Sequence, residues 1–300
     1  MTPAPERVRR GWVRPLRRLA VGVLAGLAAA AIWELYTLLG PDAGGHLFGA
    51  SLLPRAEARS MPHVWDVVAR MLAPESSATG APSVAVAMLQ ACWFTLRVAL
   101  AGWLAGVVAG FGLAIGMQRF RLAESAVFPW VVLSQTVPLI ALAPLVVGWG
   151  GKIQVGDLVW ERWMSVALIA SYLAFFPVAV GALRGLQSPE QAHVELFRAQ
   201  AASPWRTFRS LRLPASVPYV IPALRLAAAT AVVGAIVAEV STGTKGGIGR
   251  LIIAYAQAAS GDPAKPWAAI VGAALLGLVA AGLVSLLSLG LGRYRHSEVS

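Results

Sequence analysis

The sequence has little charge and almost no cysteine. Only 13% of its 300 residues are Asp, Glu, Lys or Arg, whereas 57% are hydrophobic and the mean hydropathy is +0.67. Because soluble domains carry about 25% charged residues, this chain could not cover its surface with polar side chains in water. The same composition excludes a disordered chain. The single Cys92 cannot form an internal disulfide, which excludes a disulfide-stabilised secreted fold.

The net charge of +11 does not indicate a nucleic-acid binder. Proteins of that class gather Lys and Arg on a polar face. Here the cations lie between apolar blocks, which is the pattern of topology signals in membrane proteins. We therefore expect membrane lipid, and no nucleic acid, among the partners.

The sequence also lacks the motifs of an enzyme or of a cofactor site. Gly151-Lys152 is followed by Ile153 and has no upstream glycine at P-loop spacing, so no phosphate-binding loop is present. A Gly-x-Ser-x-Gly elbow is absent as well. The histidines are scattered without metal-ligand spacing: His46, His63, His193 and His296. We expect no catalytic, cofactor-binding or metal site in this chain.

Six apolar stretches have the length needed to cross a bilayer, which is about 20 residues. They lie at 19–39, 91–117, 126–149, 163–186, 218–242 and 267–291, and the third is interrupted by Pro129, Pro138 and Pro144. The first exceeds the apolar region of a signal peptide, which is about 7–15 residues, so we expect it to be retained. The sequence thus predicts an all-α, polytopic membrane protein with six transmembrane helices.

The polar segments divide the chain into four parts. Residues 1–18 form a basic N-terminus, 19–90 the first span with a long outer loop, 91–291 a core domain with a loop at 187–217, and 292–300 a tail. In the outer loop, apolar side chains predict an amphipathic helix over 64–72, and small residues predict a flexible linker over 74–83.

Basic residues indicate the orientation, because cytoplasmic loops carry an excess of Lys and Arg. The N-terminus, the loops at 118–125 and 184–217, and the tail hold 15 arginines, against 8 basic residues in the longer opposite loops. Both termini are therefore expected on the cytoplasmic side.

Glycines recur at four-residue spacing within the spans, as in Gly102, Gly106 and Gly110, and in Gly181 and Gly185. Two further pairs are Gly22 with Gly26 and Gly112 with Gly116. Small residues at this spacing let helix backbones approach closely. Packing inside one bundle and a contact between subunits are both compatible with the pattern.

The loop at 187–217 carries unusually clear helix signals. Ser188-Pro189-Glu190-Gln191 predicts a capping box, and Ser203-Pro204 predicts the start of a second helix. Arg206, Arg209 and Arg212 lie beside an apolar stripe on that helix. An amphipathic hairpin at the lipid headgroups and a docking element for a cytoplasmic protein remain alternatives on this evidence.

The same loop resembles a known signature. Membrane subunits of binding-protein-dependent ABC importers carry Glu-Ala-Ala, three residues, Gly, nine residues, Ile, any residue and Leu-Pro. Here Glu195, Ala201 and Leu211 take the Glu, Gly and Ile places. Ala201 adds only a methyl to what we expect to be helix, so docking should survive. The resemblance implies an ATPase-coupling surface made of Glu195, Leu196, Phe197, Ala201, Ala202, Ser203, Leu211, Leu213 and Pro214.

Flanking motifs resemble the nitrate, sulfonate and taurine branch of these permeases over residues 90–290. They are Thr95-Leu96-Arg97, the stretch 138–145, Phe175-Phe176-Pro177, and Ala238-Glu239 followed by Gly246-Gly247-Ile248-Gly249. The resemblance implies a type I importer permease fold in a bacterial inner membrane. It also implies a separate ATPase that binds ATP and Mg, an external solute-binding protein and a second permease copy. Substrates of this branch include nitrate, sulfonates, taurine and pyrimidine-type precursors, and residues 261–267 lean toward the last group.

Polar residues inside the spans are candidates for the pathway or a gate. Ser134, Gln135 and Thr136 stand beside Pro138, where they could line a cavity or repair a broken helix. Glu239 is expected near the outer end of its span, in a gate or in a structural pair. A stand-alone secondary transporter or channel is the alternative function, and it would need Arg225 or Glu239 as an intramembrane ion site.

Overall fold

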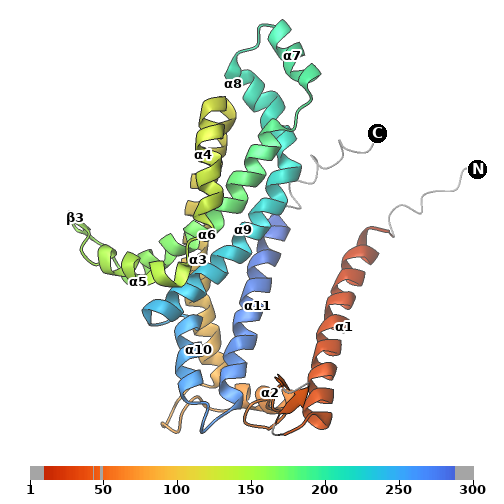
Figure 1. Cartoon of the computed structure of the whole chain (residues 1–300), viewed down its shortest axis with the longest axis vertical. Coiled ribbons are helices and arrows are strands. Elements are labelled where there is room, and N and C mark those ends of the chain that lie inside the picture. Colours follow the sequence, from red (N-terminus) through yellow and green to blue (C-terminus); the bar gives the residue numbers. More distant parts are fainter. Residues whose placement is uncertain (1–9, 43, 48–49, 288–300) are drawn as a thin grey trace, which may run out of the picture. The chain divides into compact units, whose positions relative to one another are not determined.

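The computed structural model describes residues 10–42, 44–47 and 50–287, most of which are helical (Figure 1). The contacts of the chain divide it into two compact units. Unit 1 comprises Met1–Val84 and Ala256–Ala268, and unit 2 comprises Ala85–Tyr255 and Ala269–Ser300. The tail at 292–300 and residues 1–9 of the basic N-terminus, including Arg7 and Arg9, lie outside the described residues.

Five helices among the described residues are long and apolar enough to cross a membrane. They are α1 (Arg10–Leu39), α3 (Val84–Arg119), α6 (Arg162–Gln187), the run Pro204–Thr242 that ends in α9 (Leu213–Thr242), and α11 (Ala264–Leu287). The predicted all-α membrane fold is confirmed, with a sixth span where the helices α4 and α5 are taken together as one broken crossing.

The predicted third span is sharply bent. The helices α4 (Arg121–Ser134) and α5 (Leu139–Gly150) meet at 99° across residues 135–138. Pro138 stands directly before α5, and proline both lacks an amide hydrogen and disfavours helix in the preceding residue. Pro129 and Pro144 lie inside α4 and α5 without ending them. Pro138 is therefore the one proline of the three that coincides with the break.

Close backbone approach joins α3, α6 and α9 in unit 2. A Cβ added to Gly106 of α3 would lie 2.8 Å from Ala174 Cβ on α6, and one added to Gly185 of α6 would lie 2.8 Å from Ser216 Cα on α9. These glycines serve packing within the chain, which was one of the two predicted roles. An added Cβ would meet nothing within 4 Å at four other positions of the predicted pairs: Gly22, Gly26, Gly112 and Gly116.

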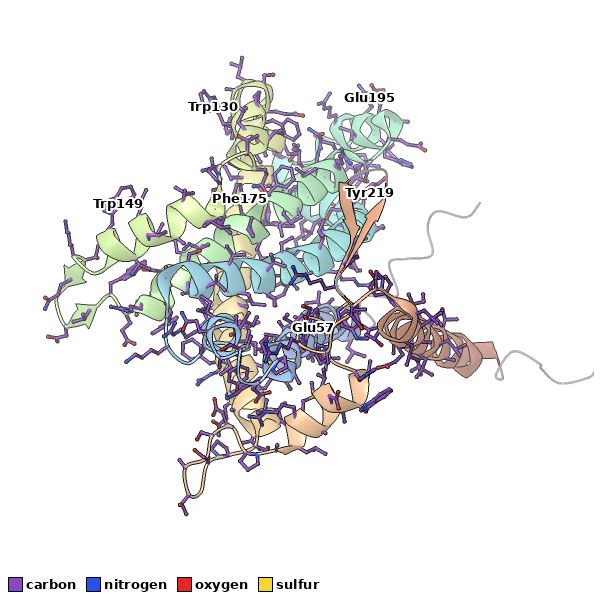
Figure 2. All side chains as sticks on the ribbon, turned by 60° about the horizontal axis from the view of Figure 1, so that its bottom comes forward. Glu57, Trp130, Trp149, Phe175, Glu195 and Tyr219 are labelled. Atoms are coloured by element: carbon purple, nitrogen blue, oxygen red, sulfur yellow. The ribbon has the colours of Figure 1, made fainter. Side chains whose placement is uncertain are left out.

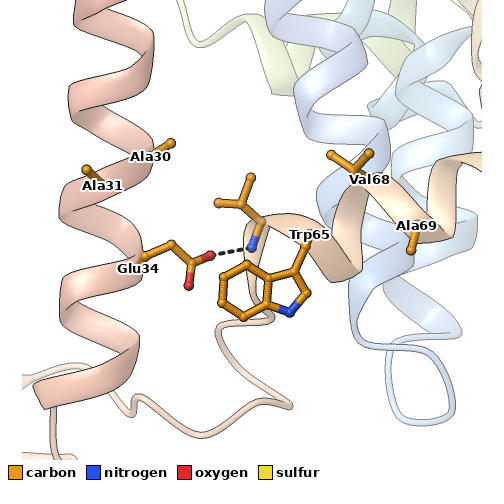
Figure 3. Close-up of a pocket in the computed structure, with 7 residues that line it drawn as sticks. Ala30, Ala31, Glu34, Trp65, Val68 and Ala69 are labelled. Carbon is orange, nitrogen blue, oxygen red and sulfur yellow. Dashed lines mark hydrogen bonds between the residues drawn. The ribbon is translucent and has the colours of Figure 1, made fainter.

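In unit 1 a carboxylate joins the short helix α2 (Val64–Leu72) to α1. Glu34 of α1 accepts a 2.6 Å hydrogen bond from the Val64 amide, and its other oxygen lies 2.8 Å from His63 Nδ1. The two helices line an apolar hollow of about 540 Å³ beside Trp65 and Ala31 (Figure 3). The predicted amphipathic helix over 64–72 is confirmed, and Glu34 caps it from a different helix.

The remaining parts of unit 1 are held by hydrogen bonds. Strands β1 (Gly45–Leu47) and β2 (Ala50–Leu53) form an antiparallel hairpin. Residues 74–83, predicted as a flexible linker, are closed by a 2.8 Å bond from the Glu75 amide to Pro82 O. Within 261–267, Asp262 pairs with Arg70 and Lys265 Nζ donates to Glu75 O at 2.7 Å. That stretch therefore makes structural contacts.

Two elements of unit 2 were not predicted. The helix α10 (Ile248–Gln257) follows α9, and a small hairpin of β3 (Gln154–Val155) and β4 (Leu158–Val159) follows α5. The neighbouring helices α4 and α5 expose Trp130 and Trp149, which are 72% and 64% accessible (Figure 2). Exposed tryptophans of this kind are typical of membrane interfaces.

Candidate functional site

The loop at 187–217 folds into a helical hairpin at one end of unit 2. It contains α7 (Gln191–Ala199), α8 (Pro204–Thr207) and the π-helical turn η1 (Phe208–Arg212), which continues directly into α9. Figure 1 shows α7 and α8 at the end of unit 2 opposite to α10. The helical run into the fifth span therefore begins at residue 204, earlier than the predicted 218. We call this segment, residues 188–212, the coupling hairpin.

The hairpin and the start of α9 hold every residue of the loop signature. Glu195, Leu196 and Phe197 lie on α7, Ala201 and Ala202 form the turn, Ser203 precedes α8, Leu211 lies in η1, and Leu213 and Pro214 begin α9. Glu195 and Leu196 are exposed, the leucine to 53%, and Figure 2 shows Glu195 on α7 away from the packed bundle.

Ala201 has a left-handed backbone, with φ +53°. Its amide donates to Arg198 O at 2.9 Å, and the Ala202 amide donates to Phe197 O at 3.0 Å. These two bonds form a Schellman motif that closes α7, in which the left-handed position favours glycine. The expectation that Ala201 adds a methyl within a helix is therefore wrong. The signature's glycine falls at a helix end, where an L side chain is strained.

Replacing Ala201 with glycine is expected to stabilise the hairpin. A left-handed L-residue is strained by about 1–2 kcal/mol, and glycine's greater chain entropy offsets part of that gain. The Ala202 amide should then exchange with solvent about fivefold more slowly, as a net gain of about 1 kcal/mol requires. Hydrogen exchange measured by mass spectrometry over residues 190–207 checks this.

The matched control is Ala199→Gly, in the last helical position of α7. Glycine is about 1 kcal/mol less favourable than alanine inside a helix, so this variant should speed the same exchange. If the two glycine variants changed exchange in the same direction, the left-handed assignment of residue 201 would be wrong.

The two predicted helix caps differ in outcome. Ser203 caps α8 as predicted: its hydroxyl accepts from the Arg206 amide at 3.2 Å, and Pro204 occupies the first helical position. The predicted capping box at Ser188 is wrong, because α7 begins at Gln191 without a side-chain cap. Ser188 instead ends α6, and its hydroxyl donates to Gly185 O at 2.8 Å.

The base of the hairpin is fixed to the helix bundle. Phe208 of η1 packs against a buried cluster that includes Met117 of α3 and Leu186 of α6. Arg212 Nη1 donates to Leu186 O at 2.9 Å, and Ser188 Oγ lies 3.3 Å from Ala215 O of α9. The half-buried Phe208 and Arg212 thus anchor the base of the hairpin to the helix bundle.

A basic hollow of about 530 Å³ lies between the hairpin and the end of α3. Arg119 of α3, Arg198 of α7 and Arg212 of η1 line it together with Trp205 and Phe208, whose rings stack at 5.6 Å. No carboxylate is among the described residues that line it. The hollow thus combines positive charge with aromatic surface, and α7 contributes Val194 and Arg198 to it.

The polar residues at the α4–α5 bend bond largely to their own backbone. Ser134 Oγ donates to Val131 O at 2.7 Å and Thr136 Oγ1 to Leu133 O at 2.8 Å. Tyr172 of α6 donates to Ser134 O. Leu133 O also accepts from the Thr136 amide at 3.0 Å and Ser134 O from the Val137 amide at 3.4 Å, so the side chains add to the backbone bonds that close the end of α4. Thr136 and Pro138 are exposed, whereas Ser134 and Gln135 are half-buried.

Glu239 belongs to a buried polar cluster at the far end of α9. It and Thr95 of α3 have no accessible surface. Thr95 Oγ1 donates to Glu239 Oε1 at 2.8 Å, and the Gly249 amide of α10 donates to Glu239 Oε2 at 2.9 Å. The structure thereby unites three motifs that the sequence shows separately. Sequence reasoning singled out each of them but missed the contact, since α10 was not predicted.

The fold and these two sites define a polytopic helical membrane protein with an exposed hairpin rooted in its core. Residues 102–294 match the family described as the binding-protein-dependent transport system inner membrane component. The match covers more than half of the chain, and the chain belongs to this family.

The chain is also similar to individual permeases. It is 36% identical over 145 residues to the formylaminopyrimidine transport permease protein ThiX of Halalkalibacterium halodurans, which is 48% of this chain and 54% of that protein. It is 27% identical over 158 residues to the riboflavin transport system permease protein RibX of Chloroflexus aurantiacus (53% and 55%). It is 29% identical over 203 residues to the putative aliphatic sulfonates transport permease protein SsuC of Bacillus subtilis (67% and 68%). The chain thus spans little more than half the length of the first two relatives.

Proposed function

We propose that this chain is the membrane-spanning permease subunit of an ATP-driven importer. In this proposal it has no catalytic activity, and ATP and Mg are bound by a separate ATPase subunit. The observation that carries the proposal is the coupling hairpin, which exposes Glu195 and Leu196 while Phe208 and Arg212 fix its base in the core. A partner that binds the exposed end of the hairpin can therefore move α6 and α9. Membership of the family supports an ATPase as that partner.

The proposed orientation places the coupling hairpin and both termini in the cytoplasm of a bacterial cell with the chain in its inner membrane. The excess of arginine in the N-terminus, the loop at 184–217 and the tail supports this orientation. The end of unit 2 that carries α10 then faces outward, toward an external solute-binding protein. By resemblance, two copies of the chain form the pathway.

The proposed mechanism is alternating access. Closure of the ATPase pair displaces the hairpin, and the packed helices α6 and α9 reorient with it. The α4–α5 bend is the proposed part of the pathway, because Thr136 and Pro138 are exposed there and Ser134 and Gln135 lie beside them. Coupling requires only that the ATPase contacts the hairpin differently in its two states.

The proposed substrate is a small solute, either of the nitrate, sulfonate and taurine class or of the pyrimidine-type class. The name of SsuC supports a sulfonate within the first class, and the name of ThiX supports a formylaminopyrimidine within the second. Residues 261–267 add no support for the pyrimidine class, since Asp262, Lys265 and Trp267 are engaged with Arg70, Glu75 and Trp33 of unit 1. Selection between the classes is proposed to occur in the external binding protein.

Reconstitution in proteoliposomes tests the proposed function. The chain is incorporated with its ATPase and binding protein, and uptake of labelled taurine, formylaminopyrimidine, riboflavin and nitrate is measured with and without ATP. We expect uptake of one class that requires all three components and ATP. Uptake by the chain alone would overturn the importer assignment in favour of a stand-alone transporter or channel.

A further inference from the structure

The helix α10 receives its N-terminal cap from two other helices. The Ile248 amide donates to Thr95 Oγ1 of α3 at 2.9 Å, and the Gly249 amide donates to Glu239 Oε2 of α9 at 2.9 Å. The first amides of a helix have no partner within it, and a side chain just before the helix usually accepts from them. Here the acceptors lie 153 and 10 residues away in the sequence.

The cap is buried and internally linked. Thr95 Oγ1 donates to Glu239 and accepts from Ile248, so one hydroxyl bridges the carboxylate and the helix. Thr95, Glu239 and Ile248 have no accessible surface. Water therefore cannot replace a lost bond, and removing one group leaves its partners unsatisfied. The carboxylate also lies at the positive end of the α10 dipole.

The glycines of the Gly246-Gly247-Ile248-Gly249 motif have a physical role in this contact. A Cβ on Gly247 would lie 2.1 Å from Glu239 Cδ, and a Cβ on Gly249 would lie 2.6 Å from Ile236 O of α9. Any side chain at either position would push α10 away from α9. The motif is therefore what allows the carboxylate to reach the amides.

We propose that Thr95 and Glu239 form a clasp that fixes α10 to α3 and α9, so that the three move as one body during transport. Glu239 is in this view a positioning residue rather than a pathway-lining one. The helix α9 has 30 residues, about 45 Å at 1.5 Å per residue, and runs from the coupling hairpin to the clasp. Movement of the hairpin is thereby transmitted through α9 to α10 at the opposite end of unit 2.

Hydrogen exchange in the full chain, purified without partners, tests the clasp itself. Thr95→Val keeps the side-chain shape and removes the hydroxyl, whereas Thr95→Ser keeps the hydroxyl. We expect the Ile248 and Gly249 amides to exchange about tenfold faster in Thr95→Val, the ratio expected from loss of one N-cap, and at the unaltered rate in Thr95→Ser. Exchange in α6 and α7 should stay unchanged, which separates local release from general unfolding.

Unchanged exchange at Ile248 and Gly249 in Thr95→Val would overturn the clasp. Glu239→Gln gives a second test should Thr95→Val fail to fold. Its amide oxygen can still accept from Gly249 but carries no charge, so a rise in exchange confined to α10 is expected. Equal exchange in Glu239→Gln and the unaltered protein would count against the carboxylate as the cap.

The role of the clasp in transport rests on the proposed importer function. It is tested by a separate measurement, ATP-dependent uptake. Thr95→Val should lower ATP-dependent uptake about tenfold while the ATPase still hydrolyses ATP, and Thr95→Ser should retain uptake. Full uptake by Thr95→Val with faster α10 exchange would overturn the joint movement. Because the exchange measurement requires no solute, failure of the importer assignment and failure of the clasp are distinguishable.

Discussion

Replacing Glu195 with lysine is expected to lower ATP-coupled uptake at least about tenfold while leaving the chain inserted in the membrane. Glu195 is exposed on α7, and its carboxylate accepts a 3.2 Å hydrogen bond from Gln191 Nε2 within the same helix. The substitution therefore leaves the packing of the bundle unchanged and reverses the charge at the proposed ATPase contact. Substituting a residue at the centre of a protein interface can cost more than about 2 kcal/mol of binding free energy. Uptake and co-purification with the ATPase should therefore fall at least about tenfold.

The matched control is Glu190→Lys, which makes the same charge change on the same hairpin. Glu190 is exposed and precedes α7, five residues before the contact. It should retain most of the uptake. A second variant, lacking residues 193–207, should lose co-purification with the ATPase altogether. If Glu195→Lys transported normally, or if the deleted protein kept its ATPase, the hairpin would not be the coupling element.

Replacing Gly110 with valine is expected to prevent stable folding of unit 2. A Cβ at this position would lie 2.5 Å from Phe175 O and 3.0 Å from Val178 Cβ, both on α6. The nearest atom belongs to helix backbone, so a rotamer change cannot relieve the clash. Overpacking of this kind destabilises by about 1–3 kcal/mol or more, and helix association in lipid depends on this close approach. The yield of monodisperse protein and its thermal unfolding temperature in detergent should both fall.

Gly112→Val is the control two residues along the same helix. An added Cβ there meets nothing within 4 Å, although the change in helix propensity is the same. This variant should unfold within a few degrees of the unaltered protein, since surface substitutions usually change stability by about 0.5 kcal/mol or less. Equal losses in both variants would show that propensity, rather than contact with α6, controls the stability of α3.

The coupling hairpin shows how far local sequence signals reach. Ser203-Pro204 specified a helix start because a cap and a proline at the first position act within one turn. Ser188-Pro189 gave a similar signal but ends α6, since its hydroxyl found carbonyl partners on α6 and α9 instead. The strained backbone of Ala201 could not be predicted from the sequence. Its left-handed φ angle arises because α7 ends at this point of the chain.

Composition and periodicity by themselves determined the membrane-spanning class, the number of apolar stretches, the loop signature and the basic residues that indicate orientation. These properties depend on residues close together in the sequence, where hydrophobic length and capping chemistry act. The tertiary structure alone decided the 99° bend at Pro138, the existence of α10 and the union of Thr95 with Glu239. Those features depend on groups up to 153 residues apart satisfying one another's hydrogen bonds out of contact with water, and no local pattern encodes that pairing.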